Sequence, residues 1–324
     1  MLYAINKFRF VSRFLLLAVI LLAYACGDDA NRVVIDFSNA VASERTVERS
    51  SEPPILRVAV GAMISPQETL SYYSQLLNYI GGGLGLKVQL IQRKTYAEIN
   101  ALFGKGEIDL AFVCSGPYAN AKETYGFDLL STPQIHGSHF YQSYLIVNRD
   151  SLFHSLKDLR GTAFAFTDPD SNTGKLVPTY WLARWGESPE TFFSKTIYTY
   201  SHNNSILAVA KGLVEGAAVN SLIWEYYHNK SPNFTSQTRI IKKSEPYGNP
   251  PLVTARHLSP ALKDRIRQLV FSMHLNSEGR EILKELMIDR FIESQDDWYV
   301  RIRQMAQELS WMEQEIYAFS KPQK

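Results

Sequence analysis

The sequence FAFTDPDSNTGKLVPTYWLARW, residues Phe164–Trp185, carries the clearest structural pattern in the chain. An apolar run ends at an Asp-Pro-Asp turn, small hydroxyl and amide residues follow at Ser171–Gly174, and an apolar-periodic segment begins. This order predicts a strand, a tight turn and the start of a helix. Ser171 or Thr173 can cap that helix, because a hydroxyl oxygen accepts from the N–H groups of its first turn. The remaining N–H donors and the helix dipole suit an anion, so the pattern fits an ordinary capped helix or an anion-binding turn.

Strand and helix patterns alternate before and after this stretch. Short apolar runs bounded by turn residues predict strands, and apolar residues at every third or fourth position predict helices. Gly81–Gly83 is expected to end the first helix. The expected strands are Ile55–Gly61, Lys87–Gln92, Ile108–Cys114, Tyr141–Val147, Gly161–Phe166, Thr196–Tyr200, Val214–Asn220 and Ile240–Lys243, with helices at Ser65–Ile80, Tyr96–Phe103, Asn204–Lys211 and across Leu262–Tyr317.

The alternation predicts a doubly wound α/β protein with two lobes and a cleft between them. The lobes are expected to join through strands near Tyr144–Val147 and Ile240–Ala255. The expected organisation is a signal peptide at residues 1–25, a flexible tether at 26–54, a first lobe at 55–143, a second lobe at 144–243, a return to the first lobe at 244–290 and a C-terminal helical segment at 291–324.

The N-terminus has the pattern of an export signal. Basic residues precede the apolar run Phe14–Ala25, which is too short to span a bilayer but suits the apolar region of a signal peptide. Small residues before Cys26 resemble a bacterial lipobox, so cleavage before Cys26 and a lipid on its sulfur are expected; an ordinary signal peptide cut after Ala25 is the alternative. Cys114 then has no partner and is expected to be a buried thiol.

Composition indicates an ordinary globular protein. Hydrophobic residues make up 45% of the 324 residues and charged residues 20%. Removing the signal segment with Lys7, Arg9 and Arg13 leaves 31 of the 34 basic residues against 32 acidic ones, a balance that does not favour a nucleic-acid partner.

The loops at the carboxyl ends of the expected strands are rich in hydroxyl, amide and glycine residues. They hold neutral donors that can bind an oxyanion but supply little to a reaction, and they lack a cluster of Lys or Arg. His136 and His139 form the only close histidine pair, without a neighbouring cysteine or carboxylate, so no metal or cofactor is expected. Gly-x-Ser-x-Gly, Gly-x-Gly-x-x-Gly and Walker motifs are also absent from the sequence.

Several segments, in order, resemble the phosphate/phosphite/phosphonate-binding proteins of ABC transporters, which are type 2 periplasmic binding proteins. The similarity runs from about Leu56 to Ile288, and its most specific piece is Asp168–Pro178, DPDSNTGKLVP. Other pieces are TYAEINALFGKGEIDLAFVCSGPYA, FYQSYLIVNRDS, SHNNSILAVAKGLVEGAAVNS and PPLVTARHLSP. The resemblance implies two hinged α/β lobes that close on a tetrahedral oxyanion, with no catalysis.

The resemblance also implies roles for individual residues. Ser171, Asn172 and Thr173 would meet the oxygens of the anion through N–H groups and hydroxyls, although Asn172 replaces the hydroxyl residue usual in the family. His202, expected in the loop before its helix, would donate to the same group. Tyr96 and Tyr141 would line the opposite wall, and Ser115, in the loop after Ile108–Cys114, is a further ligand-binding candidate.

Two positions indicate that the ligand has no amine. Family members that bind aminoalkylphosphonates place acidic residues near the amine, and here Leu222 and Asn249 or Pro250 stand at those positions. An ammonium group facing leucine would be poorly solvated, at a cost of roughly several kcal/mol. The ligand is therefore expected to be phosphate, phosphite or a small phosphonate without an amine.

The expected protein is a monomeric, lipid-anchored receptor on the periplasmic side that serves an ABC permease. One alternative is a receptor for a membrane signalling partner such as a sensor kinase. A second, from a different class, is an extracytoplasmic esterase or phosphatase using Ser115 or His202.

Overall fold

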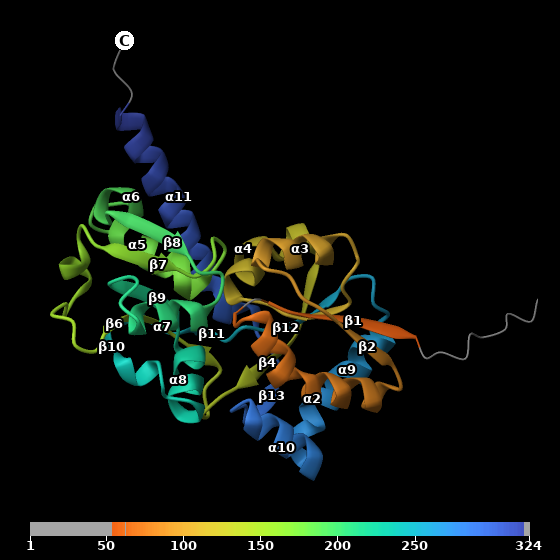
Figure 1. The fold of residues 1–324 in the computed structure, drawn as a ribbon. Helices are drawn as coiled ribbons and strands as arrows, with labels where there is room; N and C mark the ends of the chain where they lie inside the picture. Colours follow the sequence, from red (N-terminus) through yellow and green to blue (C-terminus); the bar gives the residue numbers. More distant parts are fainter. Residues whose placement is uncertain (1–53, 62, 321–324) are drawn as a thin grey trace, which may run out of the picture. The chain divides into compact units, whose positions relative to one another are not determined.

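The computed structural model describes residues 54–61 and 63–320. The expected signal peptide, Cys26 and nearly all of the expected tether lie outside these residues. Within them the chain forms two large β-sheets, each with helices packed against it (Figure 1).

The first sheet has six strands in the order β13-β4-β12-β3-β1-β2. Strands β1, β2 and β3 are parallel, and β12, β4 and β13 complete the sheet through antiparallel pairs. Its core joins apolar side chains of the sheet to those of α2, α3 and α9. The strands are β1 (Ile55–Val60), β2 (Lys87–Ile91), β3 (Leu110–Phe112), β4 (Phe127–Gln134), β12 (Leu252–Ala255) and β13 (Arg290–Ile292), and the helices are α2 (Pro66–Leu84), α3 (Tyr96–Gly104), α4 (Ser115–Tyr125), α9 (Pro260–Ser272) and α10 (Ser277–Glu285).

The second sheet has five strands in the order β10-β6-β9-β7-β8. Side chains along β6 alternate between two apolar clusters, with Leu145 and Val147 in one and Tyr144 and Ile146 in the other. Both faces of this sheet are therefore covered, as expected of a doubly wound fold. The strands are β6 (Ser143–Asn148), β7 (Ala163–Phe166), β8 (Lys195–Tyr198), β9 (Gly216–Asn220) and β10 (Thr238–Lys243), and the helices are α5 (Val177–Ala183), α6 (Pro189–Phe192), α7 (His202–Ala210) and α8 (Ser221–Lys230).

The chain passes between the sheets through two short strands that pair with each other. Strand β5 (Phe140–Tyr141) connects β4 to β6, and β11 (Tyr247–Gly248) connects β10 to β12. They form an antiparallel ribbon in which Tyr141 is paired with Tyr247. Strand β11 lies between the prolines at 246 and 250.

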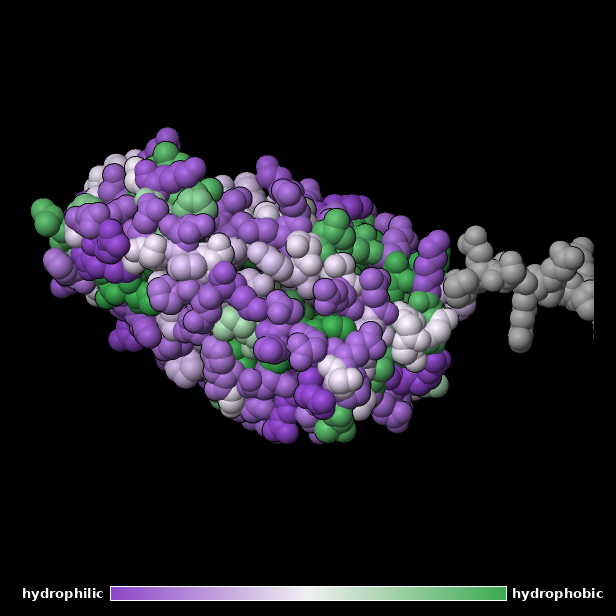
Figure 2. All heavy atoms as spheres, turned by 60° about the horizontal axis from the view of Figure 1, so that its bottom comes forward, coloured by the Kyte–Doolittle hydropathy of each residue, from purple (hydrophilic) through white to green (hydrophobic). Residues whose placement is uncertain are grey.

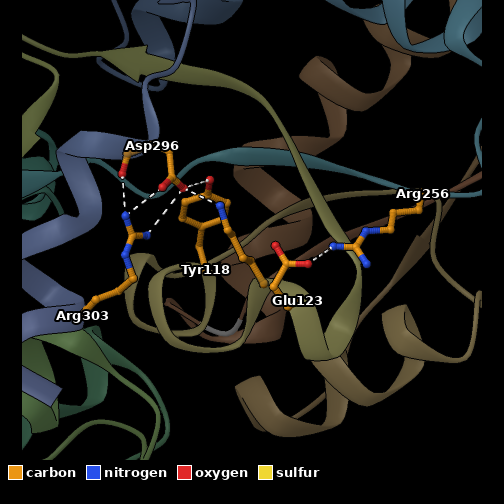
Figure 3. Close-up of polar contacts among 6 residues, drawn as sticks. Tyr118, Glu123, Arg256, Asp296 and Arg303 are labelled. Atoms are coloured by element: carbon orange, nitrogen blue, oxygen red, sulfur yellow. Dashed lines mark hydrogen bonds and ion pairs between the residues drawn. The ribbon is translucent and has the colours of Figure 1, made fainter. Parts of the chain in front are cut away.

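The C-terminal helix α11 (Val300–Ser320) packs against α4 and α5, which belong to different sheets (Figure 1). Just before it, the Asp296 carboxylate accepts from the Tyr118 hydroxyl, at 2.7 Å, and from Lys122 of α4, while Arg303 of α11 donates to the same carboxylate (Figure 3). Figure 3 also shows the neighbouring pair of Glu123 and Arg256. These contacts hold α4, whose first turn belongs to the candidate site, against the C-terminal segment.

Two expectations for the helices are wrong. Gly81–Gly83 lies inside α2, which ends at Leu84 and is followed by Gly85 in the left-handed conformation. A Cβ on Gly81 would lie 2.8 Å from Val88 Cγ2, and one on Gly83 would lie 2.7 Å from Leu269 Cδ1. These glycines therefore allow close packing rather than ending the helix.

The segment expected to be helical from residue 291 begins instead with a strand. Phe291 and Ile292 belong to β13, which pairs antiparallel with β4 at the edge of the first sheet. Tyr299, Ile302 and Met305 then join the core of that sheet. Pairing of β13 with β4 therefore overrides the helical pattern at Phe291 and Ile292, while Ile302 and Met305 lie in the helix α11.

The face seen in Figure 2 is mostly hydrophilic, with hydrophobic side chains in separate small patches. Among the described residues, no helix combines the length and apolar character required to span a bilayer.

Candidate functional site

The turn after β7 holds the first group of candidate residues. Ser171 caps the following segment, because its Oγ accepts from the Gly174 N–H at 3.0 Å. That segment, Asn172–Leu176, is a single π-helical turn leading into α5. Ser171, Asn172 and Thr173 are completely buried. The sequence left the cap open between Ser171 and Thr173. In the structure Ser171 is the cap, and the hydroxyl of Thr173 makes no capping hydrogen bond.

Two glycines allow the backbone to come close at this turn. A Cβ on Gly174 would lie 2.4 Å from Thr167 Oγ1. A Cβ on Gly116, at the start of α4, would lie 2.6 Å from the Asp170 carbonyl oxygen and 3.0 Å from the Asn172 nitrogen. The loop after β3 and the turn after β7 are therefore in direct backbone contact, although they follow strands of different sheets.

His202 lies at the start of α7 rather than in the preceding loop, and Ser201 is the N-cap. The backbone N–H of His202 donates to the Met63 carbonyl at 2.9 Å. Its Nδ1 accepts from the Asn220 N–H at 3.1 Å and lies 3.1 Å from Thr167 Oγ1. Because a backbone N–H can only donate, Nδ1 is unprotonated and the proton of the neutral ring is on Nε2. His202 therefore presents a neutral N–H donor.

Complete burial lowers the pKa of His202 to about 3. In the unfolded chain a histidine titrates near 6.5, so between these values the unfolded state binds the extra proton. Stability is therefore expected to fall as the pH drops from about 6.5 toward 3, by up to about 1.4 kcal/mol per pH unit. We expect His202→Gln to reduce the loss in the free energy of unfolding between pH 7 and pH 5, measured by urea denaturation. An identical loss in both proteins would contradict this assignment.

Tyr96 and Tyr141, the candidates expected to line the opposite wall, contact the turn in different ways. The backbone N–H of Tyr96 donates to Asp168 Oδ2 at 3.1 Å, and the buried ring packs with Met63 and Cys114. Asn172 Nδ2 donates to the Tyr141 hydroxyl at 3.1 Å, which joins the turn to β5. The structure therefore brings Tyr96 and Tyr141 to the turn.

Ser115 and Cys114 are engaged by the protein itself. The Ser115 hydroxyl donates to the Gly248 carbonyl of β11 at 2.7 Å, so it ties α4 to the ribbon. Cys114 is free and buried, as predicted. Burial raises the pKa of its thiol to about 11, against the opposing effect of N–H groups from Asn172 and Gly116.

Several polar side-chain atoms around the turn are buried without any hydrogen-bond partner in the part of the chain that the structure describes. They are the Tyr96 hydroxyl, Thr173 Oγ1, Ser201 Oγ, His202 Nε2 and the acceptor Asn172 Oδ1. Leaving such a group buried and unpaired costs about 1–3 kcal/mol, so groups of this kind point to a ligand. Ser201 was missed by the sequence analysis, although its place directly before His202 could have suggested it.

The unpaired atoms are hydroxyl, imidazole and amide groups, all uncharged. Groups of this kind can surround an anion with donors, and Asn172 Oδ1 can accept from a protonated oxygen. No set of three or more His, Cys, Asp or Glu residues within the described ranges could hold a metal ion. The arrangement is thus suited to binding an oxyanion through neutral groups.

Comparison with known proteins identifies related sequences. A family described as "ABC transporter, phosphonate, periplasmic substrate-binding protein" matches residues 58–299. The chain is 28% identical over 252 residues to a phosphonates-binding periplasmic protein of Escherichia coli K12, covering 75% of this chain and 73% of that protein. It is 26% identical over 224 residues to the phosphate-import protein PhnD of Mycolicibacterium smegmatis, covering 64% and 68%.

Solved structures show the same fold. The binding-protein component of an ABC phosphonate transporter from Pseudomonas aeruginosa superposes with a TM-score of 0.77 at 26% identity, covering 81% of this chain and 88% of that one. PhnD1 of Prochlorococcus marinus in complex with methylphosphonate gives 0.72 at 19% identity, covering 80% and 99%. The predicted fold, that of type 2 periplasmic binding proteins, is confirmed.

Proposed function

Because this chain belongs to the family of periplasmic phosphonate-binding proteins of ABC transporters, we propose that it captures a phosphorus oxyanion for import. The observation that carries the proposal is the group of buried, unpartnered atoms formed by the Tyr96 hydroxyl, Thr173 Oγ1, Ser201 Oγ and His202 Nε2. Related proteins named for phosphonate and phosphate support the same ligand class. The family is a solute-binding component of transport, which is not an enzyme.

The binding mechanism uses fixed neutral donors in place of water. Hydrogen bonds to an ionised acceptor are about twice as strong as those between neutral groups, and burial strengthens them further. Burial keeps His202 neutral, and its Nδ1 accepts from the Asn220 N–H, so Nε2 presents a neutral N–H donor near neutral pH. The site thus holds the anion without a cationic side chain.

Capture requires the site to open and close, and we propose that each sheet with its helices moves as one lobe. Residues 55–143 and 244–292, which include β13, form the first lobe, and residues 144–243 form the second. The β5–β11 ribbon is the hinge in this proposal, because both connections between the large sheets pass through it. Contacts of His202 with Met63 and of Tyr96 with Asp168 join residues of the two lobes and would close over the ligand.

The proposal also covers the identity of the ligand and the attachment of the protein to the membrane. We propose phosphate, phosphite or a small phosphonate without an amine as the ligand, and a lipid on Cys26 that holds a monomeric receptor on the periplasmic side for its permease. Leu222 and Pro250, which stand where an amine would need acids, line one cavity. That arrangement supports the expectation of a ligand without a cationic tail.

Thermal unfolding of the mature protein with single oxyanions tests the proposal. Phosphate, phosphite or methylphosphonate at about 100 times its Kd should add about 2.7 kcal/mol to the free energy of unfolding, and calorimetry should give one site per chain. Sulfate at equal ionic strength separates specific binding from a general salt effect. If none of the phosphorus oxyanions stabilises the protein more than sulfate, the proposed function is wrong.

A further inference from the structure

The C-terminal helix α11 is attached at its start to the first lobe. Ile302 and Met305, in its first two turns, are completely buried in the core of the first sheet. The hydroxyl of Tyr299, directly before the helix, donates to the Asn249 carbonyl at 2.8 Å. The Asp296 carboxylate adds the bonds to α4 that Figure 3 shows. The start of α11 is therefore built into the first lobe.

Further along, α11 contacts the second lobe. Val177 and Tyr180 of α5 pack against the same apolar cluster as the helix. The Tyr180 hydroxyl donates to Glu308 Oε2 and accepts from Arg301 Nη2 at 3.1 Å. Arg301 also donates to Glu308 Oε1 and to Glu245 Oε1, both at 2.9 Å. We call the group of Tyr180, Arg301 and Glu308 the latch, because it joins α11 to a helix of the second lobe.

The two attachments of α11 differ in burial. The side chains that fix its start to the first lobe are completely buried. On the latch side, the Arg301 and Glu308 side chains are 31% and 34% exposed, and Trp311 in the next turn is 63% exposed. Water can therefore replace the hydrogen bonds of the latch. Because α11 is one continuous helix, it cannot follow both lobes when they separate, and the latch is the weaker attachment.

We propose that the latch favours the closed arrangement of the lobes, so that the C-terminal helix controls how readily the receptor opens. The inference rests on the lobe movement in the proposed function and adds an element that regulates it. When the lobes separate, Tyr180 leaves with α5, while Arg301 and Glu308 stay on α11 and keep their own ion pair. Opening therefore exchanges both bonds of the Tyr180 hydroxyl for bonds to water.

Release of methylphosphonate tests the inference, because the ligand can leave only after the lobes separate. Tyr180→Phe should make dissociation roughly three- to tenfold faster, since it removes hydrogen bonds to charged groups that are partly exposed. Stopped-flow measurement of tryptophan fluorescence gives the dissociation rate separately from the association rate. Thermal unfolding verifies that the variant is folded. An unchanged dissociation rate in folded Tyr180→Phe would overturn the inference.

Lys122→Met is the matched control, because it removes one donor to a carboxylate on the other side of α11. Lys122 of α4 donates to Asp296 Oδ1 at 2.8 Å, and Asp296 keeps Arg303 as a partner when the ammonium is removed. This contact lies within the part of the protein that moves with the first lobe, so the dissociation rate should not change. If Lys122→Met accelerates dissociation as much as Tyr180→Phe, α11 does not stay with the first lobe and the inference is wrong.

Amide hydrogen exchange of the ligand-free protein separates the latch from the proposed function. The Tyr96 N–H donates to Asp168, and the His202 N–H donates to the Met63 carbonyl, so both amides lose a partner in the other lobe on opening. Their exchange rates follow the population of the open state. Tyr180→Phe should raise both rates roughly three- to tenfold.

An amide within one lobe is the reference for this measurement. The Ala255 N–H donates to the Asp109 carbonyl at 2.9 Å inside the first lobe and should exchange at the wild-type rate in both variants. If methylphosphonate, phosphate and phosphite do not bind but the two interlobe amides respond as expected, the proposed function fails and the latch stands. If those amides do not respond, or if Ala255 is accelerated equally, the latch is wrong.

Discussion

Replacing Thr173 with valine is expected to weaken oxyanion binding by roughly 10- to 100-fold, without lowering the stability of the unliganded protein. Valine has nearly the shape of threonine, and Thr173 Oγ1 has no hydrogen-bond partner among the described residues. Its removal therefore leaves no protein group unpaired. A hydrogen bond to a charged ligand contributes about 1.5–3 kcal/mol, which sets the expected loss of affinity. Calorimetry and thermal unfolding measure the two effects separately.

Thr254→Val is the matched control for this experiment. Thr254 Oγ1 is also buried and unpartnered within the described part of the chain, but it lies on β12. Both variants should match or exceed the wild type in thermal stability, and only Thr173→Val should lose affinity. Equal affinity in all three proteins would remove Thr173 from the site.

The change at Thr173 is a cleaner test than His202→Ala. Alanine at His202 removes a donor, but it also leaves the Asn220 N–H without its acceptor and opens a gap in a fully buried region. Its effect on affinity would therefore be mixed with a loss of stability. The sequence alone does not distinguish these two variants. It shows neither the bond from the Asn220 N–H to His202 nor that Thr173 Oγ1 has no partner among the described residues.

The local pattern around Phe164–Trp185 is enough to predict the strand, the turn and the helix start that follows. It could not decide which hydroxyl caps the turn, because Ser171 and Thr173 have the same chemistry and spacing suited to a cap. The answer depends on a π-helical turn whose position is fixed by contacts outside it, including the bond from Ser143 Oγ to the Thr173 carbonyl at 2.7 Å. Ser143 is 30 residues away in the sequence.

The wrong predictions about the fold also arise because contacts with residues outside the local sequence decide the structure. Gly81–Gly83 reads as a helix stop, yet the helix continues because Val88 and Leu269 pack where side chains would stand. His202 was placed before its helix because asparagines that follow it are good caps, whereas the helix starts at His202 with its N–H bonded to Met63. In each case a distant residue outweighs the local preference.

Replacing Gly116 with alanine is expected to weaken binding at least about 100-fold, by preventing closure. The new Cβ would lie 2.6 Å from the Asp170 carbonyl oxygen and 3.0 Å from the Asn172 nitrogen, and both atoms are backbone that cannot rotate away. Gly116 follows β3 of the first sheet, and the turn follows β7 of the second, so the overlap forces the proposed lobes apart. A cost of a few kcal/mol to the closed state lowers apparent affinity by this amount.

The position of the overlap makes this variant a test of closure rather than of ligand contact. Small-angle scattering should show that ligand compacts the wild type but not Gly116→Ala, while each lobe keeps its fold. Gly82→Ala is the control, because Gly82 lies in a helix with no atom within 4 Å of an added Cβ. It should gain about 0.5–1 kcal/mol of stability with unchanged affinity. If Gly116→Ala binds phosphonate as tightly as Gly82→Ala, the close approach of α4 to the turn is not part of the bound state.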